Sequence, residues 1–219
     1  MIKDIYNGID TFLSLKSQYQ IGKKDSSILS KLSTKCKLNP DPKLCEEVYS
    51  DISTTRYGFN EKILFEADFF FAKKNLDDDD PNLMLKLIKK YEDKQYSANA
   101  YFAMINYYRL NEDSNRESDI FKKFSNIFND NPSTLNQYAW RMTELGKNLN
   151  DALDKANRAI ELSFDNPSLQ TYIIDTKAEI LWILGQIDEA IKTIDLAIDI
   201  NPNDEYLIEQ RHKFLNSKK

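Results

Sequence analysis

The sequence has few of the residues that form turns or chemically active sites. Its 219 residues include only 5 glycines and 6 prolines, too few for collagen-like, low-complexity or all-β proteins, since the last need turn residues at short intervals. With two cysteines and one histidine, the chain lacks the ligands of a Cys/His metal site. No segment approaches the run of about 20 apolar residues that a membrane-spanning helix needs. We therefore expect no metal site and no membrane insertion.

The charged residues are nearly balanced in sign. Thirty lysines and arginines face 35 acidic residues, which gives a net charge of −5. Basic pairs such as Lys73-Lys74 and Lys122-Lys123 are dispersed among acids, which is typical of solvated helix faces. Such a chain has no general attraction for the phosphate backbone of nucleic acids. We therefore expect no nucleic-acid partner.

The sequence also lacks the motifs of catalysis. The single histidine, His212, stands between Arg211 and Lys213 in a segment expected to form the last helix, and no flanking motif supplies a nucleophile. The few glycines do not have the spacing of a phosphate-binding or dinucleotide-binding loop. We predict a protein that is not an enzyme, with no catalytic residues and no cofactor.

What the chain does contain is helical periodicity with a long repeat. Apolar residues recur at intervals of three and four almost throughout. In the second half, Asn-Pro dipeptides end at Pro132, Pro167 and Pro202, at a constant spacing of 35 residues. A period of this length indicates an array of helix pairs. Gly146 and Gly185 fit the turns within the pairs, because a positive φ angle is cheap only for glycine.

Residues 185–202, GQIDEAIKTIDLAIDINP, resemble the second half of the tetratricopeptide repeat (TPR) consensus. Ala139 and Ala178 supply the small residue of that family's first helix. Three departures from the consensus make the register uncertain by about one residue. Lys177 replaces a usual leucine, Asn148 is inserted after Gly146, and Phe164 stands near the expected proline.

This resemblance implies an all-α fold, an α-α superhelix in which TPR-like helical hairpins form a solenoid that ends in a C-terminal capping helix. Residues 1–95 show no repeat and are predicted to be a helical N-terminal region, made of degenerate repeats or of a separate helical subdomain. Residues 96–219 are predicted to hold the repeats and the cap. The predicted repeats span about 97–131, 132–166 and 167–202, and the cap helix spans 203–217.

The resemblance further implies a non-enzymatic protein–protein interaction module, which binds a peptide or a partner helix in a concave groove. In this register the groove residues lie three positions before, and one or four after, Ala139 and Ala178, and Glu144 and Tyr172 flank them. Carboxylates and two indoles at these positions suit basic or apolar partners rather than an acidic C-terminal peptide. Alternatively, the two tryptophans pack between helices, or the chain's own N-terminal helices fill the groove. The predicted groove residues are Asn136, Trp140, Thr143, Glu144, Tyr172, Asp175, Glu179 and Trp182.

A second, weaker resemblance concerns the segments 135–140 and 174–178. They are similar to the helical tails that follow a thioredoxin-fold domain in some bacterial envelope proteins. The alternative function is therefore an accessory or C-terminal helical domain of a thiol-disulfide protein, and a helix expected over Ile2–Ser17 would be the end of the preceding domain. No Cys-x-x-Cys motif is present, so the chain itself is not a thioredoxin-type redox centre.

The two cysteines, Cys36 and Cys45, lie close together in the sequence. Pro40 and Pro42 between them predict a corner between two helices, which would bring the thiols together. Either they form a disulfide, which would imply an oxidising compartment, or they are two half-buried thiols. We expect a cytoplasmic protein if Met1 is the natural start, and a periplasmic or envelope protein if the sequence is cut from a longer chain.

Overall fold

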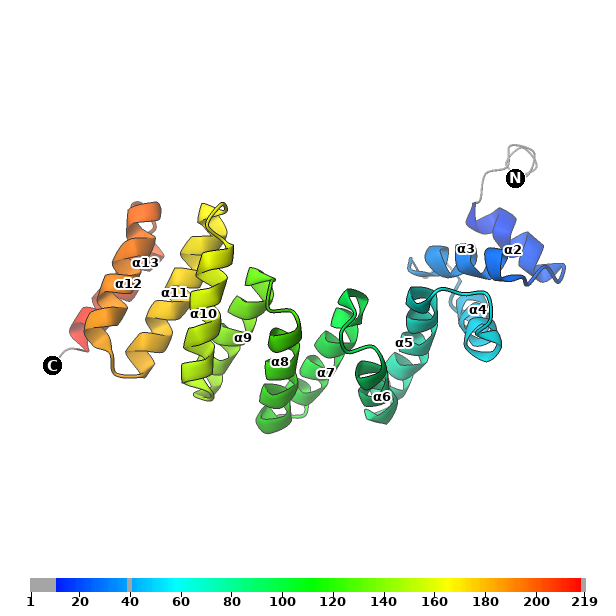
Figure 1. Ribbon diagram of the computed structural model, residues 1–219, viewed down its shortest axis with the longest axis horizontal. Coiled ribbons are helices and arrows are strands. Elements are labelled where there is room, and N and C mark those ends of the chain that lie inside the picture. The colour runs from blue at the N-terminus through cyan, green and yellow to red at the C-terminus, as the bar shows by residue number, and fades with distance from the viewer. Residues whose placement is uncertain (1–10, 39–40, 218–219) are drawn as a thin grey trace. The chain divides into compact units, whose positions relative to one another are not determined.

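The computed structural model describes residues 11–38 and 41–217, and within these ranges it contains twelve α-helices, one short 3-10 helix and no strand (Figure 1). The predicted all-α fold class is confirmed. The chain divides into two compact units, Met1–Tyr107 and Tyr108–Lys219. Each unit is described by itself below.

In the first unit, helices that follow one another in the sequence pack together: α2 against α3, α3 against α4, α4 against α5, and α5 against α6. The part of the predicted Ile2–Ser17 helix before residue 11 lies outside the described residues, and α2 itself begins at Phe12 after the cap residue Thr11. The helices of this unit are α2 (Phe12–Gln20), α3 (Ser26–Cys36), α4 (Pro42–Thr55), α5 (Glu61–Asp77), α6 (Asn82–Lys90), the 3-10 helix (Gln95–Ser97) and most of α7 (Ala98–Leu110).

Cys36 and Cys45 are joined by a disulfide. Cys36 is the last residue of α3, and Cys45 lies in the first turn of α4. Both cysteines are buried in the core of the first unit, beside Leu32 and Val48. The crosslink therefore fastens two packed helices at their junction, and closing so short a loop contributes about 2–3 kcal/mol in an entropy-based estimate.

Helix α5 carries aromatic residues on several sides and packs between α4 and α6. The ring of Phe70 stacks on Tyr49 of α4 with centroids 4.9 Å apart. On another side, Phe65 meets the edge of Tyr91 at 5.3 Å. Ion pairs add to these contacts, since Arg56 donates to both carboxylate oxygens of Asp68 at 2.9 and 3.2 Å. The aromatic richness of α5 thus reflects neighbours on two faces.

The second unit is built from helix pairs (Figure 1). α9 packs on α10 and α11 on α12 in the most extensive contacts of the unit, while α10 also packs against α11, and α12 against α13. This arrangement confirms the predicted helical solenoid with an additional C-terminal helix. The helices are α8 (Ser114–Ile127), α9 (Pro132–Leu145), α10 (Leu149–Leu162), α11 (Pro167–Ile183), α12 (Ile187–Ile200) and α13 (Glu205–Asn216).

The turns within the pairs have the expected chemistry. Gly146 follows α9 with φ of 62°, and Gly185 follows α11 with φ of 76°, so both predicted positive-φ positions are confirmed. The inserted residue Asn148 is also left-handed, with φ of 50°, and its side-chain amide donates to the Ser118 hydroxyl at 2.8 Å. The insertion is therefore absorbed in the α9–α10 turn without disturbing either helix.

Helix α11 is one turn longer than its counterpart α9. α9 has 14 residues and α11 has 17, although both begin with a proline and are capped by an asparagine side chain. Ala139 lies seven residues after Pro132, whereas Ala178 lies eleven residues after Pro167. Because both alanines are fully buried, they mark the same register. The additional residues therefore form an extra N-terminal turn on α11.

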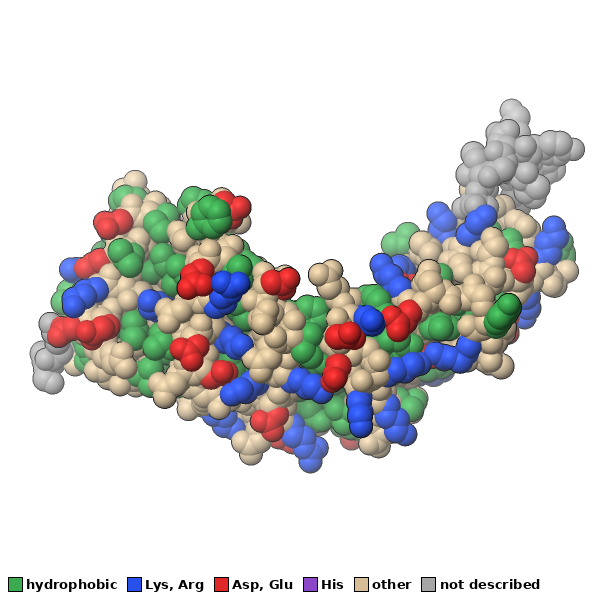
Figure 2. Space-filling model, in the orientation of Figure 1, with side chains coloured by type: hydrophobic (Ala, Val, Ile, Leu, Met, Phe, Trp, Pro, Cys, Tyr) green, Lys and Arg blue, Asp and Glu red, His purple; other side chains and the backbone are tan. Residues whose placement is uncertain are grey.

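The face that Figure 2 shows mixes the two signs of charge, with lysines and arginines interspersed among acidic and apolar side chains. No field of one sign dominates it, as the balanced composition of the chain predicts.

Alanines hold α11 and α12 close together, which gives a test of the register. Ala190 is fully buried in a cluster with Ile174, Ala178 and Leu181 of α11. We expect Ala190→Leu to overpack this contact and lower the free energy of unfolding by about 1–3 kcal/mol. Lys192→Leu, which puts the same side chain on an exposed position of α12, should change it by less than about 0.5 kcal/mol. Denaturant unfolding followed by circular dichroism measures both, and equal effects would contradict the register.

Candidate functional site

The predicted groove residues on α9 differ in their exposure. Trp140 is 39% exposed and Glu144 is exposed, while Asn136 is half-buried. Thr143 is buried, and its hydroxyl donates to the Ala139 carbonyl of the preceding turn at 2.8 Å. The Thr143 hydroxyl is thus already bonded within its own helix, and its place in the groove stays a prediction. The Oδ1 atom of Asn136 is buried and has no hydrogen-bond partner among the described residues.

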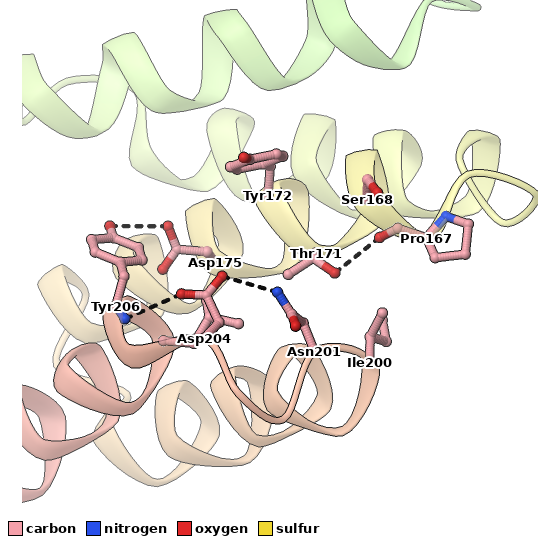
Figure 3. Close-up of a pocket in the computed structure, with 10 residues that line it drawn as sticks. Pro167, Ser168, Thr171, Tyr172, Asp175, Ile200, Asn201, Asp204 and Tyr206 are labelled. Atoms are coloured by element: carbon pink, nitrogen blue, oxygen red, sulfur yellow. Dashed lines mark hydrogen bonds between the residues drawn. The ribbon is translucent and has the colours of Figure 1, made fainter.

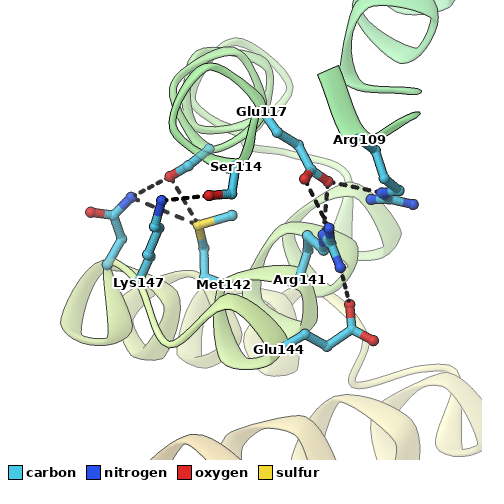
Figure 4. A network of polar contacts seen from close by, with 9 residues as sticks. Arg109, Ser114, Glu117, Arg141, Met142, Glu144 and Lys147 are labelled. Carbon is cyan, nitrogen blue, oxygen red and sulfur yellow. Dashed lines mark hydrogen bonds and ion pairs between the residues drawn. The ribbon is translucent and has the colours of Figure 1, made fainter. Parts of the chain in front are cut away.

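Glu144 belongs to a polar network centred on a buried carboxylate (Figure 4). Glu117 of α8 is almost fully buried. It accepts from Arg109 at 2.8 Å and from Arg141 at 2.7 and 2.8 Å. Burial raises the pKa of Glu117, but the bonds from the two arginines prevail and hold it below its usual value. Arg141 also donates to Glu144 at 3.0 Å, so the Glu144 charge is already paired.

On α11, two predicted groove residues are bound by the C-terminal helix. Lys213 of α13 donates to both carboxylate oxygens of Glu179 at 2.7 Å. The same ammonium lies 4.1 Å from the ring centre of Trp182. The Trp182 indole donates to the Ser217 hydroxyl at 2.7 Å and packs against Phe214. Glu179 and Trp182 therefore anchor the cap helix, and Trp182 packs between helices.

The other two predicted groove residues on α11 line a pocket (Figure 3). Tyr172 is 70% exposed, and Asp175 is 8% exposed. The pocket has a volume of about 340 Å³. Its walls come from the first turns of α11, the end of α12 and the start of α13. The lining residues are Pro167, Ser168, Thr171, Tyr172, Asp175, Ile200, Asn201, Asp204, Tyr206 and Leu207.

Hydrogen bonds fix the pocket's rim. Asp204 is the cap residue of α13: its Oδ1 accepts from the Tyr206 backbone at 3.1 Å, and its Oδ2 accepts from the Asn201 amide at 3.1 Å. The Tyr206 hydroxyl donates to Oδ2 of Asp175 at 3.2 Å. The extra turn of α11 brings Pro167 and Ser168 to the opposite wall. Sequence reasoning missed Asp204 and Tyr206.

Asp175 is electrostatically unusual. Burial raises its pKa to about 6; the hydrogen bond from Tyr206 opposes this rise, as does the charge of Lys213, while the charges of Glu179 and Asp204 add to it. Its Oδ1 atom is buried without a hydrogen-bond partner among the described residues. Burial and the Asp175 charge also raise the pKa of Tyr206 to about 12, so its phenol stays a neutral donor. Of the residues that the structure describes, no lysine or arginine lines the pocket.

Within 11–38 and 41–217, no group of three or more His, Cys, Asp or Glu side chains could hold a metal ion. In these ranges no helix combines the length and the apolar character needed to span a bilayer.

The fold matches that of a solved TPR structure. The structure of YrrB, a TPR protein with an unusual peptide-binding site, aligns with a TM-score of 0.60 at 10% identity, over 92% of this chain and 100% of that one. TTC0263, a thermophilic TPR protein of Thermus thermophilus, aligns with a TM-score of 0.42 at 18% identity, over 93% of this chain and 96% of that one. The first alignment confirms the predicted TPR-type fold. The resemblance to thioredoxin-associated tails stays a prediction.

The comparisons by sequence give nothing further. No family model matches the chain, and no curated protein matches it.

The raised pKa of Asp175 predicts a pH dependence of stability. Because the folded state binds the Asp175 proton more tightly than the unfolded state, this group makes stability fall as pH rises from about 4 to about 6. Asp175→Asn removes the buried charge and keeps an acceptor for Tyr206. We expect the variant to be more stable than the parent at pH 7, by on the order of 1–3 kcal/mol, and to match it near pH 4.

Thermal unfolding at both pH values measures this difference. Asp154→Asn, which removes an exposed carboxylate on α10, is the control for the change in net charge. A parent protein that is more stable than Asp175→Asn at pH 7 would show that the Asp175 charge is compensated in the folded state.

Proposed function

We propose that this TPR-type solenoid is a non-enzymatic binding module, which takes an extended peptide or a partner helix on the surface formed by α9 and α11. The fold itself is one of protein-interaction modules. The observation that carries the proposal is the exposure of two aromatic rings on helices that pack together: Trp140 on α9 and Tyr172 on α11. Exposed aromatic side chains are favoured anchors in interfaces, because each buries a large area on binding.

The charges on this surface favour one class of partner. Recognition of an acidic C-terminal peptide needs free donors, yet Lys213 is bound to Glu179 and Arg141 to Glu117 and Glu144. Asp175 instead offers an unpaired acceptor, since its Oδ1 atom has no partner among the described residues. We therefore propose a partner segment that combines an aliphatic or aromatic anchor with basic residues. The proposal involves recognition alone, with no catalytic residue, metal or cofactor.

Peptide binding tests this function. The probes are fluorescently labelled twelve-residue peptides that carry one leucine or phenylalanine with two lysines, and matched peptides with an acidic C-terminus. We expect the basic peptides to bind more tightly, and added salt to weaken the charged part. Trp140→Ala and Tyr172→Ala should each weaken binding about tenfold, since truncating an interface anchor typically costs about 1–2 kcal/mol or more.

Leu196→Ala is the matched control, because it truncates an exposed apolar residue on α12 rather than on α9 or α11. Its binding should stay within about twofold of the parent. Tighter binding of the acidic peptides, unaffected by Trp140→Ala, would contradict the proposal.

We also propose that the protein works in an oxidising compartment, which for a bacterial protein is the periplasm or envelope. The Cys36–Cys45 disulfide, buried at the junction of α3 and α4, supports this. A thioredoxin-associated role would share that compartment.

Mass spectrometry of the protein isolated from its native cells, with thiols blocked at lysis, tests the compartment. We expect the peptide pair containing Cys36 and Cys45 to remain linked, and reduction to add the mass of two hydrogen atoms. A Cys36→Ser variant should show no such change. Blocked thiols at both positions in the parent protein would contradict an oxidising location.

A further inference from the structure

We propose that the pocket between α11 and α13 binds the side chain of a lysine or arginine, as the basic-residue subsite of the partner peptide. This inference rests on the proposed function, because it assumes that the ligand is a peptide crossing α9 and α11. It adds the location, the chemistry and the pH dependence of one contact. Tyr172 belongs both to the exposed surface of α11 and to the pocket wall, which makes the two continuous.

The size of the pocket suits one side chain. Its volume of about 340 Å³ is at the lower end of the roughly 300–1,000 Å³ range of small-molecule sites. Apolar groups of Pro167, Ile200 and Leu207 contribute to the walls, and they can cover the methylene stem of a long basic side chain. The Tyr172 and Tyr206 rings, 70% and 48% exposed, stand on either side of Asp175 (Figure 3) and offer π faces to a cation.

The polar groups of the pocket select a cation. Its described lining contains two carboxylates and no lysine or arginine. Both oxygens of Asp204 are already occupied in capping α13. Asp175 is different, since it is more than nine-tenths buried and its Oδ1 has no partner in the described part of the chain. A buried anionic acceptor of this kind is costly when unpaired and is stabilised by a cation placed next to it.

The described part of the chain supplies no cation of its own for this purpose. The ionisable groups that act on Asp175 are Glu179 on its own helix, Asp204 before α13, and Tyr206 and Lys213 on α13. Lys213 is the positive one, and it is held by both oxygens of Glu179 at 2.7 Å. The neutral phenol of Tyr206 makes a bond of 3.2 Å to Asp175. In the proposed complex an ammonium or guanidinium group takes the place of this hydroxyl at Oδ2, next to the unpaired Oδ1.

The pocket should bind a cation in a pH-dependent way. Burial raises the pKa of Asp175 to about 6, so the carboxylate is charged at pH 7.5 and largely protonated at pH 5. A bound cation favours the charged form. Binding is therefore expected to weaken as pH falls through 6, whereas a contact made only by the two tyrosine rings would be insensitive to pH in this range.

The test uses Nα-acetyl-lysine methylamide as the probe and Nα-acetyl-norleucine methylamide as its neutral counterpart, titrated into the full chain and followed by NMR. We expect the lysine probe to shift the signals of Tyr172, Asp175 and Tyr206 in a saturable way, with affinity about tenfold lower at pH 5 than at pH 7.5. The norleucine probe should leave these signals in place. Asp175→Asn should lower the affinity at least tenfold and abolish its pH dependence.

Asp154→Asn is the matched control, because it makes the same chemical change at an exposed carboxylate of α10 outside the pocket and should change the affinity by less than twofold. Equal shifts with both probes, or undiminished binding by Asp175→Asn, would overturn the subsite. If the lysine probe fails while Trp140-dependent peptide binding persists, the subsite is overturned and the proposed function stands. If the probe binds but no peptide does, the pocket is a site for amines and the peptide assignment is overturned.

Discussion

The second unit depends on the close approach of helices at alanine positions. Ala178 of α11 and Ala190 of α12 are fully buried in one cluster, and a larger side chain at either position would separate the two helices. Close contact also fixes the rotation of α11 about its axis. Residues three positions apart on a helix are related by a rotation of about 300° around its axis. The orientation of α11 about its axis therefore decides that Tyr172 is exposed while Asp175 is buried. The exposed anchor and the buried acceptor are thus consequences of the same packing.

The pocket arises from an irregularity of the repeat. Pro132 and Pro167 are 35 residues apart, but the equivalent buried alanines, Ala139 and Ala178, are 39 apart. The difference of four residues is one helical turn, which extends α11 at its N-terminus. With a regular repeat, Pro167 and Ser168 would not reach the wall opposite Tyr206. The candidate site is therefore the feature in which this unit departs from the simple solenoid.

Much of the fold could be predicted from the sequence, because its signals are local. Positive φ angles at Gly146 and Gly185 follow from turn chemistry, and the helix pairs follow from the period. The mismatch between the proline and alanine spacings was also visible and would have indicated the longer α11. The pairing of Lys213 with Glu179 was not predictable, since it depends on how α13 is rotated against α11. No local pattern sets that angle. The sequence therefore predicted Glu179 as a groove residue and did not predict that Lys213 of the same chain neutralises it.

Glu117 and Asp175, two buried carboxylates of this unit, differ in whether the protein supplies a cation next to them. Glu117 and Asp175 are both almost inaccessible to solvent, and burial alone raises the pKa of each. Glu117 is bound by two arginines, and its pKa ends below the usual value. Among the described residues Asp175 accepts from a tyrosine hydroxyl alone, and its pKa lies above the usual value. A buried carboxylate without a cation beside it is costly, and a cation supplied by a partner would recover part of that cost. In the proposed complex, the partner's positive charge therefore contributes to binding at Asp175.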